Sequence, residues 1–183
     1  MNMIQNDSLL AKLDTVIKKY SNSFLNKIHP IDNIDYDILM RVFEITPEIK
    51  ATNKQYWGRE LGMIWQTLIV EISKEKCQDF NPPLKIGADE PADLFIGKDA
   101  IDTKYRVGSG DSGTLKKFKS NGKLLKEMGY KPILLILRED NLPAAITASK
   151  SGGWTILSGK QSFDYILEKT GFKIEEYLEQ VIL

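Results

Sequence analysis

The sequence feature that most constrains the fold is an uninterrupted apolar run in the second half of the chain. Residues 132–137 read Pro-Ile-Leu-Leu-Ile-Leu and include no polar side chain. Alternate side chains of a strand point to opposite faces of a sheet, so a strand that is apolar at every position is covered on both faces. We therefore expect residues 131–138 to form a central strand with helices on both sides of its sheet.

A long helix earlier in the chain supplies one of these covers. Residues 53–77 carry a broad apolar stripe at helical spacing, which is the kind of face that packs on a sheet. The stripe consists of Trp57, Leu61, Ile64, Trp65, Leu68, Ile69 and Ile72. The predicted fold class is therefore α/β (mixed α+β), with a central mixed β-sheet flanked by α-helices.

Weaker patterns predict the remaining elements. We expect helices at 8–20, 35–45, 115–128, 161–169 and 174–183, and short strands at 84–86, 144–148 and 154–157. A chain of 183 residues with 42% hydrophobic side chains is long enough for one domain with a real core. We predict a single domain over 1–183, with an N-terminal helical part at 1–50 and a core at 53–172.

Composition excludes several classes of protein. The formal net charge is zero, so global charge would not hold the chain to nucleic acid, although local patches are not excluded. One cysteine and one histidine, His29, rule out a disulfide framework, a cysteine-ligated zinc site and chemistry that needs paired histidines. His29 is interpreted as a loop or surface residue. With no signal-peptide layout and no apolar stretch of about 20 residues, we expect a cytoplasmic protein without a membrane partner.

A hairpin is predicted between residues 94 and 105, before the central strand. Gly97 and Lys98 form its turn, since glycine accepts the positive φ of the first position in a two-residue loop. In that register Asp93 lies opposite Asp102, with Cβ atoms roughly 5 Å apart. Lys104 follows two residues later and projects from the same face as Asp102.

Two carboxylates held this close repel each other, and a divalent cation turns the repulsion into a site. Magnesium (Mg²⁺) binds carboxylate oxygens and keeps several waters, while an ammonium group beside it orients an attacking water or stabilises charge on a phosphate. The pattern D-x8-D-x-K thus predicts Asp93 and Asp102 as metal ligands and Lys104 as the reactive cation. The alternative is a surface hairpin with scattered charges, because D-x-K alone is common and a one-residue slip separates the carboxylates.

Two glutamates on the long helix are candidates for a third acidic ligand. Glu60 lies near the helix start, within reach of an ion held by the hairpin, and Glu71 lies three turns further on. A single site would use only one of them, and we assign Glu60. For either residue the alternative is a solvated position on the helix surface.

Basic and small residues follow the hairpin. From Lys98 to Lys131 there are nine basic and four acidic side chains, a local charge of +5. Residues 108–114 resemble a phosphate-cradling turn before a helix, although a flexible connection or a solvated lysine face explains these runs equally simply. The predicted DNA-binding residues are Arg106, Ser109, Ser112, Thr114, Lys116, Lys117, Lys119, Lys123 and Arg138. Of these, Arg106, Arg138 and the loop would read bases, and the lysines would contact phosphates.

This order of elements, with D-x8-D-x-K on a hairpin, resembles the PD-(D/E)XK nuclease superfamily. Asp93 stands at its first acidic position, Asp102 at the second and Lys104 at the lysine, while the proline sits one residue early, at Pro91. The stretches 90–94, 100–106, 108–118 and 135–143 look like ApaLI-like type II restriction endonucleases, over roughly residues 58–172.

The resemblance implies a restriction-endonuclease-like core and a homodimer that cuts double-stranded DNA at a short palindrome. Cleavage would need Mg²⁺ and leave 5′-phosphate ends, with Glu60 as the helix acid of the site, and a cognate DNA methyltransferase is expected in the same system. Two rivals stay open. One is a structure-specific or repair nuclease of the same superfamily, and the other is a non-catalytic DNA-binding module.

Overall fold

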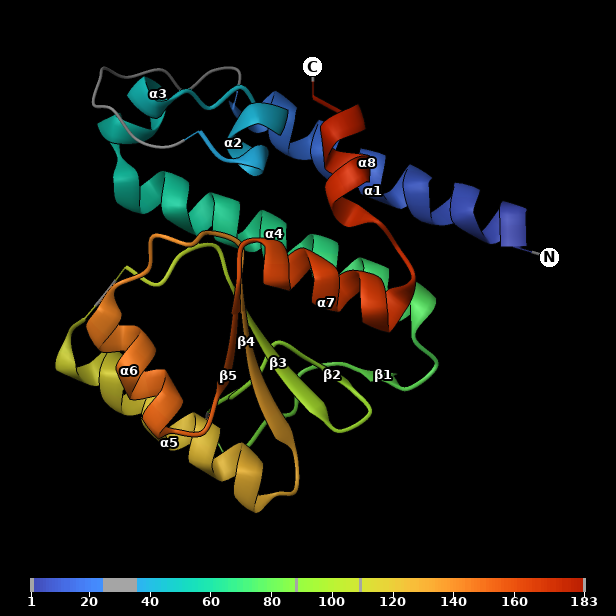
Figure 1. The fold of residues 1–183 in the computed structure, drawn as a ribbon. Coiled ribbons are helices and arrows are strands. Elements are labelled where there is room, and N and C mark those ends of the chain that lie inside the picture. Colours follow the sequence, from blue (N-terminus) through green and yellow to red (C-terminus); the bar gives the residue numbers. More distant parts are fainter. Residues whose placement is uncertain (1, 25–35, 88, 109, 183) are drawn as a thin grey trace.

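The fold is built around a mixed five-stranded sheet (Figure 1). The structure is a computed structural model, which describes residues 2–24, 36–87, 89–108 and 110–182. Within these ranges the strands are β1 (Phe80–Asn81), β2 (Leu94–Ile96), β3 (Asp99–Lys104), β4 (Lys131–Ile136) and β5 (Thr155–Ser158), in that spatial order. β1, β2 and β3 are antiparallel neighbours, whereas β4 runs parallel to both β3 and β5. The predicted mixed sheet with flanking helices is confirmed.

Helices cover both faces of the sheet and add a third layer (Figure 1). They are α1 (Asn2–Phe24), α2 (Ile38–Val42), α3 (Pro47–Thr52), α4 (Lys54–Lys76), α5 (Ser112–Glu127), α6 (Pro143–Ser151), α7 (Lys160–Thr170) and α8 (Ile174–Gln180). α4 and α7 lie on one face, and α5 and α6 lie on the other. α1, α2 and α8 stack on the outer side of α4, so α4 is enclosed between two layers.

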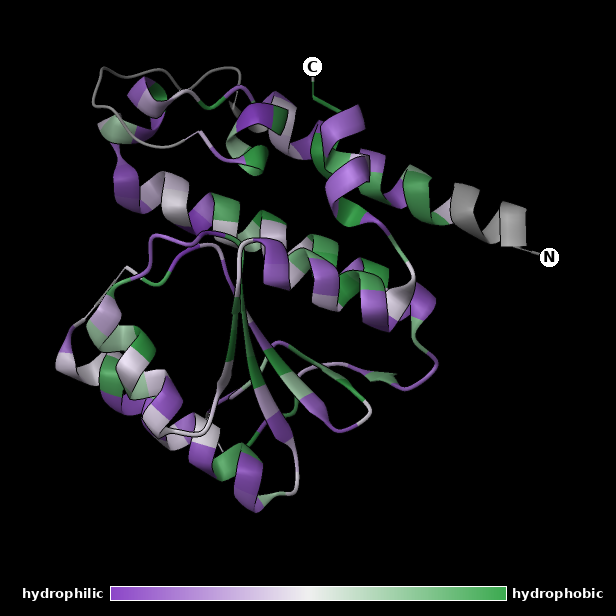
Figure 2. Cartoon of the chain, viewed as in Figure 1, coloured by the Kyte–Doolittle hydropathy of each residue, from purple (hydrophilic) through white to green (hydrophobic). Residues whose placement is uncertain are grey.

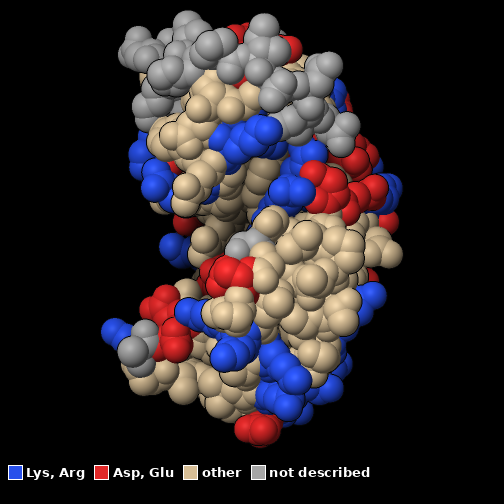
Figure 3. Space-filling model, turned by 90° about the vertical axis from the view of Figure 1, so that its left-hand side faces the viewer, with Lys and Arg blue, Asp and Glu red and all other residues tan. Residues whose placement is uncertain are grey.

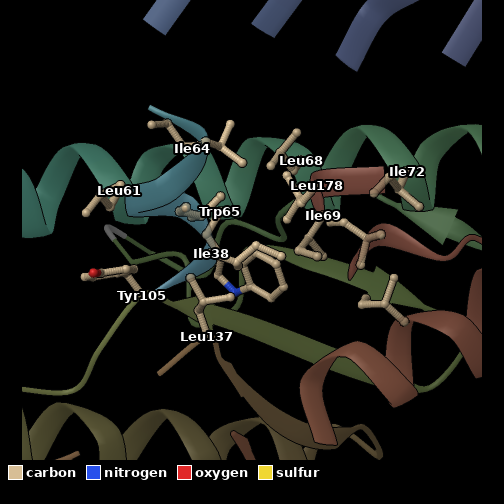
Figure 4. Close-up of a cluster of buried hydrophobic side chains, with 14 of the residues drawn as sticks. Ile38, Leu61, Ile64, Trp65, Leu68, Ile69, Ile72, Tyr105, Leu137 and Leu178 are labelled. Atoms are coloured by element: carbon tan, nitrogen blue, oxygen red, sulfur yellow. The ribbon is translucent and has the colours of Figure 1, made fainter. Parts of the chain in front are cut away.

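The central strand β4 has an apolar core on each side, as its sequence predicts. Ile133 and Leu135 belong to the cluster under α4, together with Trp65, whose indole ring lies between α4 and the strands (Figure 4). Leu134 and Ile136 belong to the second cluster, under α5 and α6. Figure 2 shows the same arrangement as hydrophobic colour along the central strands. Each fully buried Leu or Ile contributes roughly 1.5–3 kcal/mol, so β4 anchors both layers.

Helices α5 and α6 approach closely because Gly122 of α5 lies against Gly152 at the end of α6. A Cβ atom on Gly122 would lie 2.5 Å from Nε1 of Trp154 and 2.6 Å from the carbonyl oxygen of Gly152. The indole Nε1 instead donates a 2.7 Å hydrogen bond to the carbonyl of Phe118. Any side chain at 122 would therefore separate the two helices.

Several predicted elements are confirmed with small changes at their ends. α4 begins at the cap residue Asn53, whose side chain accepts from the Tyr56 N–H at 3.0 Å. The predicted helix at 35–45 is shorter, because α2 begins only after Asp37, and Asp35 lies outside the described residues. Thr46 and Pro47 begin α3 rather than end a helix, since proline at the first helical position is pre-set for the helix.

Three predictions about secondary structure were wrong. Residues 144–148 belong to α6 rather than to a strand, and Pro143 at the helix start is the signal that outweighs their short apolar run. Residues 84–86 contribute only the isolated bridge between Ile86 and Asp89, and the first strand is β1. The N-terminal helix starts at Asn2, not at residue 8. His29 lies outside the described residues.

None of the helices in the described part of the chain combines the length and the apolar character that a membrane span requires.

Candidate active site

The hairpin that carries the candidate site has the predicted register. Ile96 pairs with Asp99 and Leu94 pairs with Ile101, which leaves Gly97 and Lys98 as the turn. Gly97 has a φ of 56°. A positive φ at this first turn position is typical of a type II′ turn, which matches the twist of the two strands. One local glycine therefore sets the register of the whole hairpin.

The ladder of the hairpin ends at the pair of Leu94 and Ile101, so Asp93 is not a ladder partner of Asp102 as predicted. Asp93 lies one residue before β2 and is held by β3. Its backbone N–H donates to the carbonyl of Ile101 at 2.8 Å. Its carboxylate oxygen Oδ2 accepts from the backbone N–H of Thr103 at 2.7 Å and from the Thr103 hydroxyl at 2.6 Å. Charge-assisted bonds of this length fix the carboxylate firmly.

Asp102 and Lys104 are two residues apart on β3, so they project from one face of the sheet. The ammonium of Lys104 donates to Oδ1 of Asp102 at 2.6 Å and to the carbonyl of Thr103 at 3.1 Å. Only 15% of the Asp102 side chain is exposed, against 35% of the Lys104 side chain. The pair is thus inside the fold on the carboxylate side and open to solvent on the amine side.

Burial and a neighbouring like charge both act on Asp102. Its pKa is raised to about 6, chiefly by burial and also by Asp93, while Lys104 opposes the shift. Burial lowers the pKa of Lys104, but the charges of Asp102 and Asp93 outweigh it, so the net shift is upward. Asp93 and Asp102 therefore interact directly, and Lys104 stays protonated at neutral pH.

The long helix reaches the acid pair through Gln66 and not through a glutamate. Nε2 of Gln66 donates to Oδ1 of Asp93 at 2.9 Å. The predicted third ligand was wrong: Glu60 forms an ion pair with Arg59 at 3.1 Å. Burial and the charge of Glu60 raise the pKa of Tyr20 in α1, so Glu60 lies close to Tyr20. Because α1 packs on the far side of α4, Glu60 is on the side of the helix that faces away from the sheet.

Helical geometry explains why neither glutamate reaches the sheet. At about 100° per residue, Glu60 and Glu71 are displaced from Gln66 by roughly 120° and 140° around α4. Over the described ranges, no group of three or more His, Cys, Asp or Glu side chains is arranged to hold a metal ion. The site that remains is two carboxylates, one amide and one ammonium.

Comparisons of the chain with protein-family models, with curated proteins and with solved structures found no match. The interpretation of this site therefore depends on its own residues and contacts.

The predicted phosphate-cradling turn is closed by a side chain of its own. Asp111 caps α5, and its carboxylate accepts from the backbone N–H of Thr114 at 2.9 Å and from the Thr114 hydroxyl at 2.6 Å. An internal carboxylate thus occupies the position that a phosphate would take at this helix start. Ser112 is the first exposed residue of α5, and Ser109 lies outside the described residues.

The predicted basic residues divide into exposed and buried groups. The lysines of α5 at 116, 117, 119 and 123 are exposed, and Lys117 pairs with Asp89 at 2.9 Å. Arg106 is 44% exposed, whereas Arg138 is 4% exposed and is held by Asp37 at 2.7 Å and by Asp140 at 2.6 Å. The prediction that Arg138 reads bases was wrong, because its guanidinium is committed to two carboxylates inside the fold.

Proposed function

We propose that this protein is a magnesium-dependent nuclease that hydrolyses phosphodiester bonds of double-stranded DNA at Asp93, Asp102 and Lys104. The observation that carries the proposal is the interaction of Asp93 with Asp102 beside the ammonium of Lys104, which lies 2.6 Å from Asp102. A purely structural sheet avoids holding like charges close together, so the cost of doing so here indicates a function.

The donor set fits Mg²⁺. Asp93 and Asp102 offer hard carboxylate oxygens, and one or two carboxylates together with waters and substrate phosphate are the usual protein contribution to such an ion. When bound, Mg²⁺ supplies Lewis-acid polarisation of the phosphate and compensates the charge of the acid pair. The raised pKa of Asp102 supports this assignment, because a buried carboxylate next to another one is stabilised by a cation.

The remaining residues position the acids and the reacting groups. Thr103 and Gln66 donate three hydrogen bonds to Asp93, which restricts its carboxylate to one orientation. Lys104 is protonated and partly exposed, so we assign it the roles of orienting a water and stabilising negative charge on the phosphate. A cation with this protonation state acts as a hydrogen-bond donor and not as a general base.

We further propose the more specific function of a type II restriction endonuclease. Support comes from the resemblance of residues 90–94, 100–106, 108–118 and 135–143 to ApaLI-like enzymes and from the order α4, hairpin, α5, β4, which is compatible with a restriction-endonuclease-like core. The proposal includes a homodimer, a short palindromic DNA site, 5′-phosphate ends and a cognate methyltransferase.

Incubation of the purified protein with a sequenced plasmid and Mg²⁺, followed by mapping of the ends, tests the proposal. Discrete fragments with 5′-phosphates at a repeated sequence are the expected result. Cutting confined to branched or damaged DNA would indicate a structure-specific or repair nuclease instead. Binding without any Mg²⁺-dependent cleavage would indicate a non-catalytic module and would remove the proposal.

A further inference from the structure

A cleft of about 570 Å³ opens beside the end of β3 that carries Lys104. Its walls come from α3, from the first turns of α4 and from the segments that follow β3 and β4. Figure 3 looks at this side of the molecule and shows a hollow between the upper helices and the lower layer, with basic side chains near its margins. The residues that matter for its chemistry are Lys50, Lys54, Gly58, Arg106, Arg138 and Asp140.

The floor of the cleft is a buried network in which the charges of Arg138 and Lys50 are balanced by those of Asp37 and Asp140. Arg138 is held between Asp37 and Asp140, as described above. Tyr105 donates its hydroxyl hydrogen to Asp37 and accepts from Lys50, whose Nζ lies 3.9 Å from Asp37. Burial lowers the pKa of Lys50 to about 8. These groups satisfy one another and form a rigid support.

Two cations at the mouth of the cleft are available to a ligand. Nε of Arg106 donates to the carbonyl oxygen and to Oδ2 of Asp140, both at 2.8 Å, and this anchors the side chain. Within the described residues, the two terminal nitrogens of Arg106 make no hydrogen bond and Lys54 makes no ion pair. Lys54 is exposed in the first turn of α4, where the helix dipole is also positive.

Charge and space both favour an anion. The four basic side chains of the cleft face the two acids Asp37 and Asp140, which leaves a charge of +2. A Cβ atom on Gly58 would have no other heavy atom within 4 Å, so the wall is open at this helical turn. The guanidinium fork of Arg106 matches the geometry of phosphate oxygens.

We propose that this cleft binds a backbone phosphate of the DNA strand, with Arg106 and Lys54 as its direct contacts. The inference rests on the proposed function, because it needs DNA at the acid pair. Arg106 is two residues beyond Lys104, about 7 Å in an extended chain. Asp102 is four residues from Arg106, about 14 Å at most, so the bound phosphate lies within about four nucleotides of the one at the acid pair, given a rise of about 3.4 Å per nucleotide.

The test measures binding of a short DNA duplex in EDTA, where cleavage is suppressed, at salt concentrations from about 50 to 200 mM. Affinity falls with salt, so the slope of log affinity against log salt is negative. Lys54→Gln and Arg106→Gln should each make this slope shallower by about 1, and the double variant should make it shallower by about 2. Lys18→Gln, an exposed lysine on α1, is the control and should leave the slope unchanged. Equal slopes for all variants, or no binding by the wild type, would overturn the proposal.

A second pair of variants tests the open wall directly. Gly58→Asp places a carboxylate in the cleft and should weaken binding at least about tenfold, whereas Gly58→Ala should bind like the wild type. Similar affinities for the two variants would count against the cleft. Cleavage assays on the same proteins separate the two proposals. If the variants alter the slope but the wild type does not cleave DNA, the phosphate site in the cleft is supported and the nuclease function is excluded. If the wild type cleaves DNA but the variants leave the slope unaltered, the nuclease function is supported and the phosphate site is excluded.

Discussion

Nε2 of Gln66 donates a 2.9 Å hydrogen bond to Oδ1 of Asp93 and so joins the long helix to the acid pair. The helix contributes a neutral amide at the place where a third carboxylate was predicted. Lys104 is a positive neighbour of the pair, and the raised pKa of Asp102 depends most on burial.

Gln66→Glu should make the site more dependent on a cation. The added carboxylate would face Asp93, so we expect the free energy of unfolding in EDTA to fall by roughly 1–3 kcal/mol. Mg²⁺ should restore most of this loss, because a cation compensates all three charges. Urea denaturation with and without Mg²⁺ measures both effects.

Gln66→Met is the matched control for that experiment. It keeps the length of the side chain but removes the hydrogen bond to Asp93 and adds no charge. Its stability should respond to Mg²⁺ no more than that of the wild type. If the two variants respond equally, the side chain of residue 66 does not face the cation site.

Asp102 should destabilise the folded protein at neutral pH. Its pKa is about 6 in the fold against an ordinary value of 3.8, so the folded state binds this proton more tightly than the unfolded state. The contribution of the group to stability is full below about pH 4 and is lost as the pH rises through about 6. Asp102→Asn should therefore be more stable than the wild type at pH 7.5, by up to about 3 kcal/mol.

Denaturation of both proteins at several pH values between 4 and 7.5 measures this difference. The gap between variant and wild type should widen as the pH rises, because only the wild type carries the buried charge. A variant that loses more stability as the pH rises would contradict this account, because it would mean that the carboxylate makes favourable contacts when it is ionised.

The local parts of the site were predictable from the sequence, and the tertiary parts were not. The turn at Gly97 and the alternation of Asp102 and Lys104 depend on neighbours along the chain, so the register followed from them. The contact of Gln66 with Asp93 joins residues 27 positions apart and depends on how α4 lies across the sheet. The sequence pattern of the helix did not single out Gln66 from the candidate glutamates Glu60 and Glu71.

The same distinction explains the errors in the fold. The central strand and α4 carry long, strong patterns, and both were predicted. The 144–148 segment is a short apolar run, which periodicity alone cannot assign to strand or helix. The buried network of Arg138 was also missed, because its partner Asp37 is 101 residues away.

Gly97→Ala should weaken both the fold and the site. An alanine at φ 56° is strained, and its Cβ atom would lie 2.7 Å from Oδ2 of Asp79. We expect a loss of about 1–2 kcal/mol in the free energy of unfolding, measured by urea denaturation. Lys98→Ala, at the other turn position, should cost less than half as much, and equal losses would contradict the predicted role of the positive φ.

Asp37→Ala should be among the most damaging single changes. The carboxylate caps α2 by accepting from the Met40 N–H at 3.2 Å, and it also holds buried Arg138 and Tyr105. Loss of the cap and of one partner of a buried ion pair should cost roughly 3–5 kcal/mol. Thermal unfolding compares it with Asp37→Asn, which keeps an oxygen acceptor and should lose clearly less; equal losses would exclude this account of the network.

The central claim is that Asp93, Asp102 and Lys104 act together on a phosphodiester bond. The most direct measurement is the rate of Mg²⁺-dependent cleavage of duplex DNA by the wild type and by Asp102→Asn, with both proteins shown to be folded. The account predicts cleavage by the wild type and a loss of at least about 10²- to 10³-fold in the variant, with DNA binding retained. Cleavage by Asp102→Asn at the wild-type rate would contradict it.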